Sequence, residues 1–167
     1  QTSVANYSFY IGATNDNLAE VTSVDYRKVC GIKVFMGSST GNMLVDSDET
    51  LRKLFSNSPA TIAVHCEDEA IIKAETERFK ALYPDGNAPF TIHQHVRNAK
   101  ACYESTQKAV KLAEDTGAKL HVTHISTKRE LELFEDIPLI NKHITAEACI
   151  PHLWFDDDDY LTRTYRI

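Results

Sequence analysis

The stretch Gly31-Ile32-Lys33-Val34-Phe35-Met36-Gly37-Ser38-Ser39-Thr40-Gly41-Asn42 decides the fold, because it reads as a buried strand that ends in small and polar residues. Ile, Val, Phe and Met between glycines are typical of a strand covered on both faces, as in parallel sheets with helical crossovers. Lys33 is the exception within it. Burial lowers the pKa of a lysine, so a neutral amine becomes available for nucleophilic, basic or carbamate chemistry. The alternative is a structural lysine that pairs with a carboxylate at the strand end.

The chain has the composition of an acidic globular protein. Its 167 residues are 43% hydrophobic and 25% charged, and the formal net charge is −6. Because no basic stripe is present to collect phosphates, we expect a small-molecule substrate and no nucleic-acid partner. No window of eighteen apolar residues is present either, so we expect no membrane association.

The cysteines and the start of the chain give information about the cellular compartment of the protein. Cys30, Cys66, Cys102 and Cys149 are widely spaced and form no C-x-x-C pair, which predicts neither a zinc knuckle nor a disulfide framework and favours a reducing cytoplasm. The chain begins at Gln1, without a methionine and without a basic or apolar signal region. We therefore expect an internal piece of a longer cytoplasmic protein.

Strand-like and helix-like segments alternate along the sequence. Apolar runs predict strands at residues 7–13, 31–36, 61–66, 120–125 and 143–149. Helical periodicity predicts helices at residues 14–26, 46–55, 67–82, 98–116 and 128–134. Ser47 is expected to cap the second helix and Gly117 to end the fourth. This order predicts an α/β fold, with a parallel sheet and helical crossovers.

Two architectures fit this alternation, an open doubly wound sheet and part of a closed eight-stranded barrel. The segment Gly37-Ser38-Ser39-Thr40-Gly41 lacks the G-x-G-x-x-G order, and no G-K-[ST] follows it, which argues against nucleotide binding. A whole barrel needs about 250 residues. A (β/α)8 TIM barrel therefore requires residues 1–167 to be the central part of a single catalytic domain, with about five strand-helix units.

Candidate functional residues collect at the carboxyl ends of the predicted strands, where barrel enzymes carry their chemistry. His65 closes the third strand, His124 nearly closes the fourth, and Lys33 lies in the second. Neutral imidazole is a preferred zinc ligand. Either histidine alone is explained as well by an ordinary hydrogen-bonded role, and two at matching strand ends strengthen the metal hypothesis. Strand alternation predicts that His121 points to the face opposite His124.

For several other polar residues, the sequence allows both a functional role and a purely structural one. His93 and His95 form an H-x-H, but a Pro-rich turn before them favours a loop over a metal pair. Glu67 and Asp68 follow His65 and are candidates to orient a ligand, although the first turn of a helix explains acidic residues by the helix dipole. Glu147 lies in the apolar fifth strand and needs a partner, either a metal ligand that it orients or a basic residue.

Four motifs occur in order along nearly the whole chain: Gly-Ile-Lys33-Val-Phe-Met with the following Gly-Ser-Ser-Thr-Gly-Asn, Val64-His65-Cys-Glu-Asp, His121-Val-Thr-His124-Ile-Ser-Thr, and Thr145-Ala-Glu147-Ala-Cys-Ile-Pro-His152-Leu. In order and spacing this set resembles the dihydroorotases of the cyclic-amidohydrolase superfamily. The resemblance implies a metal-dependent TIM barrel in which Lys33 is carboxylated and its carbamate bridges two zinc ions. It assigns the second metal to His65 and His124. The implied reaction is the reversible ring closure of N-carbamoyl-aspartate to dihydroorotate in pyrimidine synthesis, by a metal-bridging hydroxide that attacks the ring amide.

The resemblance also implies groups that this chain lacks. The family has an H-x-H on the first barrel strand and a late aspartate that serves as ligand and general base, and neither appears here. We therefore expect the isolated chain to be inactive. The expected cofactor is zinc alone. A homodimer is the expected assembly of the whole protein.

Three alternatives remain open at this point. Dihydropyrimidinases, hydantoinases and allantoinases share the same lysine and histidines, although dihydropyrimidinases and hydantoinases usually continue the lysine strand as Phe-Met-Ala-Tyr-Lys, where this chain has Phe35-Met36-Gly37-Ser38-Ser39. A non-catalytic relative on the same barrel is the second, although such relatives tend to lose the ligands. The third is a plain α/β binding domain in which Lys33 forms a buried ion pair.

Overall fold

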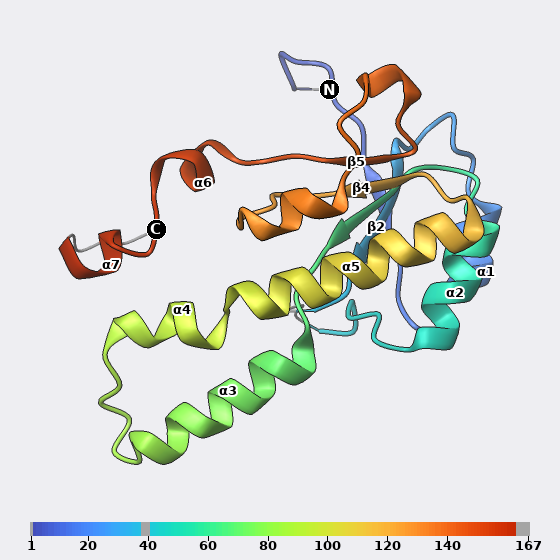
Figure 1. The fold of residues 1–167 in the computed structure, drawn as a ribbon. Coiled ribbons are helices and arrows are strands. Elements are labelled where there is room, and N and C mark those ends of the chain that lie inside the picture. Colours follow the sequence, from blue (N-terminus) through green and yellow to red (C-terminus); the bar gives the residue numbers. More distant parts are fainter. Residues whose placement is uncertain (1, 38–40, 163–167) are drawn as a thin grey trace.

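The computed structural model describes residues 2–37 and 41–162, and it shows one parallel sheet with helices packed against it (Figure 1). Ser38, Ser39 and Thr40, which follow the lysine strand, lie outside the described residues. The strands are β1 (Tyr10–Gly12), β2 (Gly31–Phe35), β3 (Ile62–His65), β4 (Leu120–Val122) and β5 (Ile144–Ala146). The α-helices are α1 (Leu18–Ser23), α2 (Asp48–Asn57), α3 (Glu69–Leu82), α4 (His93–Val96), α5 (Ala99–Thr116), α6 (Ile150–Trp154) and α7 (Asp159–Thr162). Three short 3₁₀-helices complete the list, η1 (Phe90–Ile92), η2 (Arg129–Leu133) and η3 (Leu139–Asn141).

The strand order decides between the two architectures. Each described strand pairs in parallel with the next one along the chain, in the order β1-β2-β3-β4-β5. A doubly wound sheet reverses its order at a switch point, and the described strands show no such reversal. The consecutive order is that of a (β/α)8 barrel, so the predicted TIM-barrel type is confirmed for the five strand-helix units of this chain.

The sheet buries one face against helices. Side chains of alternate strand residues, among them Val34, Val64 and Val122, are at most 1% exposed. They pack with residues of α1, α2 and α5, such as Phe55, in one continuous core. In Figure 1 the long helix α5 crosses in front of the strands, with α1 and α2 beside it. Hydrophobic burial on this face is the main stabilisation of the fold.

Within the part of the protein that this chain spans, the opposite face of the sheet is only partly covered, and burial of the lysine strand on both faces stays a prediction. In β2 the residues alternate between buried and half-buried, and Lys33 and Phe35 are half-buried. The alternation arises because successive side chains of a strand point to opposite faces. We call this half-buried side, which carries Lys33, Phe35 and His65, the open face.

Helix ends follow the signals in the sequence. The Ser47 hydroxyl accepts a hydrogen bond from the Thr50 backbone N–H at 3.2 Å, and Gly117 ends α5 in the left-handed region with φ 73°. Both predicted caps are confirmed. Two further N-caps were not predicted: Asp68 at the start of α3 and Asn98 at the start of α5.

Several element boundaries differ from the prediction. The strands are shorter than the apolar runs, because a run of apolar residues does not specify which backbone groups find a partner on the next strand. Residues 128–134, predicted as an α-helix, form the 3₁₀-helix η2, and His93 and His95, predicted in a loop, lie in α4. Glu67 precedes α3 and Glu147 follows β5, so neither lies in the element predicted for it.

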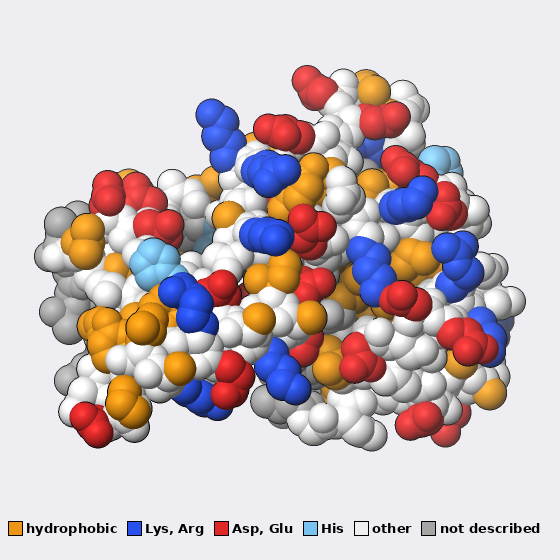
Figure 2. All heavy atoms as spheres, turned by 60° about the horizontal axis from the view of Figure 1, so that its bottom comes forward, with side chains coloured by type: hydrophobic (Ala, Val, Ile, Leu, Met, Phe, Trp, Pro, Cys, Tyr) orange, Lys and Arg blue, Asp and Glu red, His pale blue; other side chains and the backbone are white. Residues whose placement is uncertain are grey.

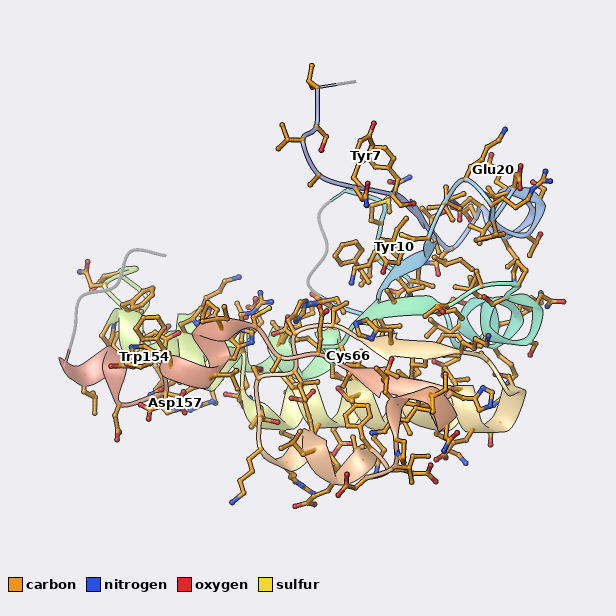
Figure 3. All side chains as sticks on the ribbon, turned by 90° about the horizontal axis from the view of Figure 1, so that it is seen from above. Tyr7, Tyr10, Glu20, Cys66, Trp154 and Asp157 are labelled. Carbon is orange, nitrogen blue, oxygen red and sulfur yellow. The ribbon has the colours of Figure 1, made fainter. Side chains whose placement is uncertain are left out.

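The two ends of the described chain lie apart. Tyr7 and Tyr10 lie at the β1 edge of the sheet, whereas Trp154 and Asp157 belong to an arm that extends away from it (Figures 1 and 3). On the face shown in Figure 2, acidic and basic side chains are interspersed, and hydrophobic side chains gather at the end that carries α3 and α4. No helix within residues 2–37 and 41–162 combines the length and the apolar character needed to cross a membrane.

Gly37 marks a close approach between the ends of β2 and β3. A Cβ atom at this position would lie 2.0 Å from the backbone oxygen of Glu67 and 2.8 Å from its carbonyl carbon. Backbone atoms cannot move aside as the tip of a side chain can. Glycine at position 37 therefore allows the chain at the end of β2 to approach the backbone of Glu67.

We expect Gly37→Ala to lower the free energy of unfolding of the intact protein by about 2–3 kcal/mol, the range of severe overpacking. Gly12→Ala is the matched control, because its Cβ would meet only the mobile end of a side chain, the Met43 methyl at 2.3 Å. Urea denaturation of the two variants and the wild type measures the difference. Equal stabilities for the two alanine variants would contradict the close approach.

The thiol of Cys66 provides a test of burial through pH. Desolvation raises its pKa from 9.0 to about 12, although hydrogen bonds with Thr106 and Ser105 partly oppose the shift. The folded state therefore holds this proton more tightly than the unfolded state. The corresponding stability is complete below pH 9 and is lost as the pH rises from 9 towards 12.

We expect the free energy of unfolding to fall more steeply with pH between 9 and 12 in the wild type than in Cys66→Ala. The difference in slope approaches about 1.4 kcal/mol per pH unit for one thiol. Other groups that titrate in this range are common to both proteins and cancel in the comparison. Parallel curves for wild type and variant would show that the thiol is not buried.

Candidate functional site

The strand register places a row of side chains across the open face. Gly12 pairs with Lys33, Lys33 with Ala63, Ala63 with His121, and His121 with Thr145. Since neighbouring residues in a row point to the same side of a sheet, Lys33, His121 and Thr145 share the open face. The next row towards the carboxyl ends pairs Phe35 with His65.

Lys33 is held by a neutral group. Its Nζ lies 3.3 Å from the Thr123 Oγ1 and 4.7 Å from the centre of the Phe35 ring. The Thr123 hydroxyl donates its own hydrogen to the Val64 carbonyl at 2.8 Å, which leaves its lone pairs for the lysine. Burial lowers the pKa of Lys33, and the more distant Cys66 and Glu147 oppose this shift. Among the described residues Lys33 contacts the Thr123 hydroxyl, and no ion pair of Lys33 is present.

His65 and His124 meet at the carboxyl ends of β3 and β4. The Nδ1 of His65 lies 3.1 Å from the Nε2 of His124, and the ring centres are 4.9 Å apart. Burial lowers the pKa of His124, and the neighbouring His65 lowers it further. The two rings thus direct one nitrogen each to a shared point at this edge of the sheet.

The backbone of His124 explains how its ring reaches His65. His124 lies two residues beyond the end of β4, and its φ is 43°, in the left-handed region that non-glycine residues rarely adopt. Such a conformation costs about 1–3 kcal/mol and is concentrated at functional sites. Because His124 is outside the strand, strand alternation does not apply to it. The prediction that His121 and His124 point to opposite faces is therefore wrong, since His121 lies on the open face and His124 contacts His65 of that face.

Glu67 and Arg97 continue the site on the other side of His65. The Oε2 of Glu67 lies 2.8 Å from the Nε2 of His65, and the guanidinium Nη2 of Arg97 donates to the same oxygen. Glu67 is only 6% exposed. The sequence offered two explanations for Glu67, orientation of a ligand or the dipole of a helix first turn, and it gave Arg97 no role. One sequence signal indicates that Glu67 contacts His65: Glu67 lies two residues after the histidine that ends the strand and before Asp68, which caps the helix.

His121 and Glu147 form a second pair on the open face. The Nε2 of His121 lies 3.2 Å from the Oε2 of Glu147, and its Nδ1 lies 2.9 Å from the Thr145 hydroxyl. The Glu147 side chain is half exposed at 51%. Of the two partners predicted for Glu147, the structure shows the basic residue. Its carboxylate contacts His121 rather than the His65–His124 pair.

The chemistry of the donor set fits part of a metal site. Two nitrogens that bind one tetrahedral zinc ion at about 2.0–2.1 Å lie about 3.3–3.4 Å apart, close to the 3.1 Å between His65 and His124. Within residues 2–37 and 41–162, no group of three or more His, Cys, Asp and Glu side chains is arranged to hold a metal ion. A metal at the histidine pair therefore needs a further ligand of another kind or from another part of the protein.

Comparison with known proteins connects this geometry to a reaction class. No protein-family model matches the chain. An allantoinase of Solibacter usitatus is 28% identical over 163 residues, and the match covers 95% of this chain and 35% of the relative. A dihydroorotase of Methanosphaera stadtmanae is 26% identical, with coverages of 84% and 32%. The solved structure of an L-hydantoinase (dihydropyrimidinase) from Arthrobacter aurescens has a TM-score of 0.81 at 25% identity, with coverages of 93% and 35%.

The homologues of this chain are cyclic amidohydrolases. The chain spans about a third of the length of the relatives that it matches. Allantoinases, an L-hydantoinase and dihydroorotases occur together among the relatives at 25–30% identity, so the comparisons do not favour one ring substrate over another. The structural neighbours are TIM-barrel enzymes, in agreement with the strand order.

The structure separates the histidines of this cyclic-amidohydrolase relative into two groups. His65 and His124 are brought together, and the ring of His152 in α6 lies edge-on to His124 at 6.5 Å. His93 and His95 are turned to different partners: the Nδ1 of His93 is 3.0 Å from the Tyr160 hydroxyl, and the His95 ring stacks on Phe79. The H-x-H sequence therefore does not form a metal pair here.

Proposed function

We propose that this chain supplies Lys33, His65 and His124 to a two-metal centre that hydrolyses a cyclic amide. The observation that carries the proposal is the 3.1 Å approach of the His65 and His124 nitrogens at adjacent strand ends, on the face that also carries Lys33. The relatedness to allantoinases, hydantoinases and dihydroorotases supports the reaction class. A two-metal centre requires further ligands besides these three side chains.

Lys33 has the environment that carbamate formation requires. Only the neutral amine attacks carbon dioxide, in a step that forms the N–C bond and releases one proton to water. Burial favours the neutral amine because it lowers the pKa of Lys33. The product is an anion with two oxygens, a bridging ligand that the ammonium form cannot provide. Thr123, bonded both to Lys33 and to the Val64 carbonyl, fixes where that group projects.

The histidines contribute neutral nitrogen donors. The lowered pKa of His124 keeps its ring uncharged at neutral pH, which is the form that binds a metal. When bound, zinc would polarise the amide carbonyl and lower the pKa of a water molecule from 15.7 to about 7. Holding the metal at this edge therefore places the reaction at the carboxyl ends of the strands, as in other barrel enzymes.

For the substrate, we propose dihydroorotate and N-carbamoyl-aspartate as the pair that is interconverted. The support is in the sequence, where Phe35-Met36-Gly37-Ser38-Ser39 replaces the Phe-Met-Ala-Tyr-Lys of dihydropyrimidinases and Thr145-Ala146-Glu147 resembles dihydroorotases. The second candidate is allantoin hydrolysis, favoured by the 28% and 30% identities to allantoinases.

A substrate panel separates the candidates. The intact zinc-loaded protein should open dihydroorotate with a kcat/KM at least about tenfold above those for allantoin, hydantoin and dihydrouracil, measured by ultraviolet absorbance or product chromatography. Ten-fold corresponds to 1.4 kcal/mol of transition-state discrimination. Preference for allantoin would transfer the assignment to the second candidate, and no turnover of any ring in a zinc-loaded sample would refute the proposed reaction class.

Lys33→Ala tests the metal centre directly. We expect the zinc content of the intact protein to fall below two per chain and kcat to drop by at least about 10³-fold, because several kcal/mol of transition-state stabilisation are lost with the bridge. Lys28→Ala, an exposed lysine with an 81% exposed side chain, is the matched control. Elemental analysis and the activity assay provide the readout. Unchanged zinc content and rate in Lys33→Ala would remove Lys33 from the site.

A further inference from the structure

A buried carboxylate lies behind His65, on the side away from His124. The Oε2 of Glu67 is 2.8 Å from the His65 Nε2, and Arg97, at the end of α4, donates its guanidinium N–H to the same oxygen. Glu67 is 7% exposed at its side chain, whereas the Arg97 side chain is 37% exposed. The contacts therefore run from a partly exposed arginine, through a buried carboxylate, to a candidate metal ligand.

This contact selects one tautomer of His65. A carboxylate that accepts from Arg97 has no hydrogen to offer, so the Nε2 of His65 must be the donor in their contact. In the neutral ring the hydrogen then lies on Nε2, and the lone pair lies on Nδ1. Nδ1 is the atom that faces the His124 Nε2 at 3.1 Å. The nitrogen that is free to bind a metal is thus the one directed at the shared point.

The position of Glu67 is fixed by its surroundings. The backbone N–H of the next residue, Asp68, donates to the Ala101 carbonyl at 2.9 Å, and the Asp68 side chain caps α3. On the other side, the backbone of Glu67 packs against Gly37 without room for a Cβ. These contacts involve the start of α3, the start of α5 and the end of β2, so the carboxylate is held from three directions.

We propose that Glu67 and Arg97 are positioning residues, which hold His65 in the Nε2–H tautomer and thereby present its Nδ1 lone pair to a divalent metal shared with His124. This inference rests on the proposed function, because it assumes that His65 binds the metal. It adds Arg97, to which the sequence gave no role, and it specifies how Glu67, which the sequence named as a candidate to orient a ligand, acts on His65. A carboxylate or carbonyl behind a ligating histidine commonly has this effect, and its removal costs about 10- to 100-fold in metal affinity or activity.

Glu67→Gln tests the carboxylate with little change in shape. In the intact protein we expect the zinc dissociation constant, measured by competition with a chromogenic chelator, to rise about 10- to 100-fold. Nitrogen-15 NMR of the metal-free protein should show His65 as the Nε2–H tautomer in the wild type and a mixture or the Nδ1–H tautomer in the variant. Glu77→Gln is the matched control, since it makes the same change at an exposed carboxylate of α3 that pairs with Lys80.

Arg97 variants test the second half of the inference. Arg97→Met should weaken zinc binding in the same direction, and Arg97→Lys should restore part of the affinity because it returns a donor to Glu67. Arg78→Met is the control for loss of an arginine, since Arg78 pairs with Glu75 on the exposed side of α3. A purely structural role would lower the melting temperature of the Glu67 and Arg97 variants but leave the zinc affinity and the His65 tautomer unchanged.

The outcomes separate this inference from the proposed function. Wild-type protein that binds no zinc would refute the metal centre itself. Wild-type binding together with unchanged affinity and tautomer in both Glu67→Gln and Arg97→Met would overturn the positioning role and leave the metal centre intact. Weaker zinc binding in both variants, with normal binding in Glu77→Gln and Arg78→Met, supports the inference.

Discussion

The parallel register of β2, β3 and β4 is the constraint on which the rest of the site depends. It brings the carboxyl ends of these strands to one edge, so residues far apart in sequence become neighbours: Lys33 reaches Thr123, and His65 meets His124. Helix packing on the other face holds that register, because a shift of one residue would exchange the apolar and polar faces of a strand. The core therefore stabilises the fold and at the same time sets the distances of the site.

The backbone makes two departures from regularity where the site is assembled. Gly37 lets the end of β2 lie against the backbone of Glu67, and His124 adopts a left-handed conformation beyond β4. Each of the two positions contacts a residue distant in sequence, Gly37 the backbone of Glu67 and His124 the ring of His65. Both contacts lie at the carboxyl ends of the strands. Glu67 is connected to both positions. Its backbone packs against Gly37, and its carboxylate contacts His65, the residue that His124 approaches.

Much of the fold could be predicted from the sequence, because alternation of apolar runs with amphipathic helices is a local signal. The caps at Ser47 and Gly117 are local as well, and both were predicted. Among the candidate site residues, Lys33 was singled out as a lysine inside an apolar strand, and His65 and His124 were singled out because each lies at or near a strand end. Glu67 was a candidate to orient a ligand because it follows His65, whereas Arg97 escaped prediction because its contact with Glu67 joins residues 30 apart in sequence. The face of His121 relative to His124 was assigned wrongly because the residue at which β4 ends is not a local property of the sequence. The metal and the ring substrate depend on groups that the described residues do not contain.

The division of the sheet into a helix-covered face and an open face has a consequence for how such proteins diversify. Residues that stabilise the chain, such as Val34 and Val64, alternate along the strands with the candidate site residues Lys33 and His65, whose side chains point to the other face. A substitution on the open face therefore leaves the packing of the core largely intact. A change of ring substrate on such a sheet requires no new core, in keeping with the allantoinases, the L-hydantoinase and the dihydroorotase among the relatives of this chain at 25–30% identity.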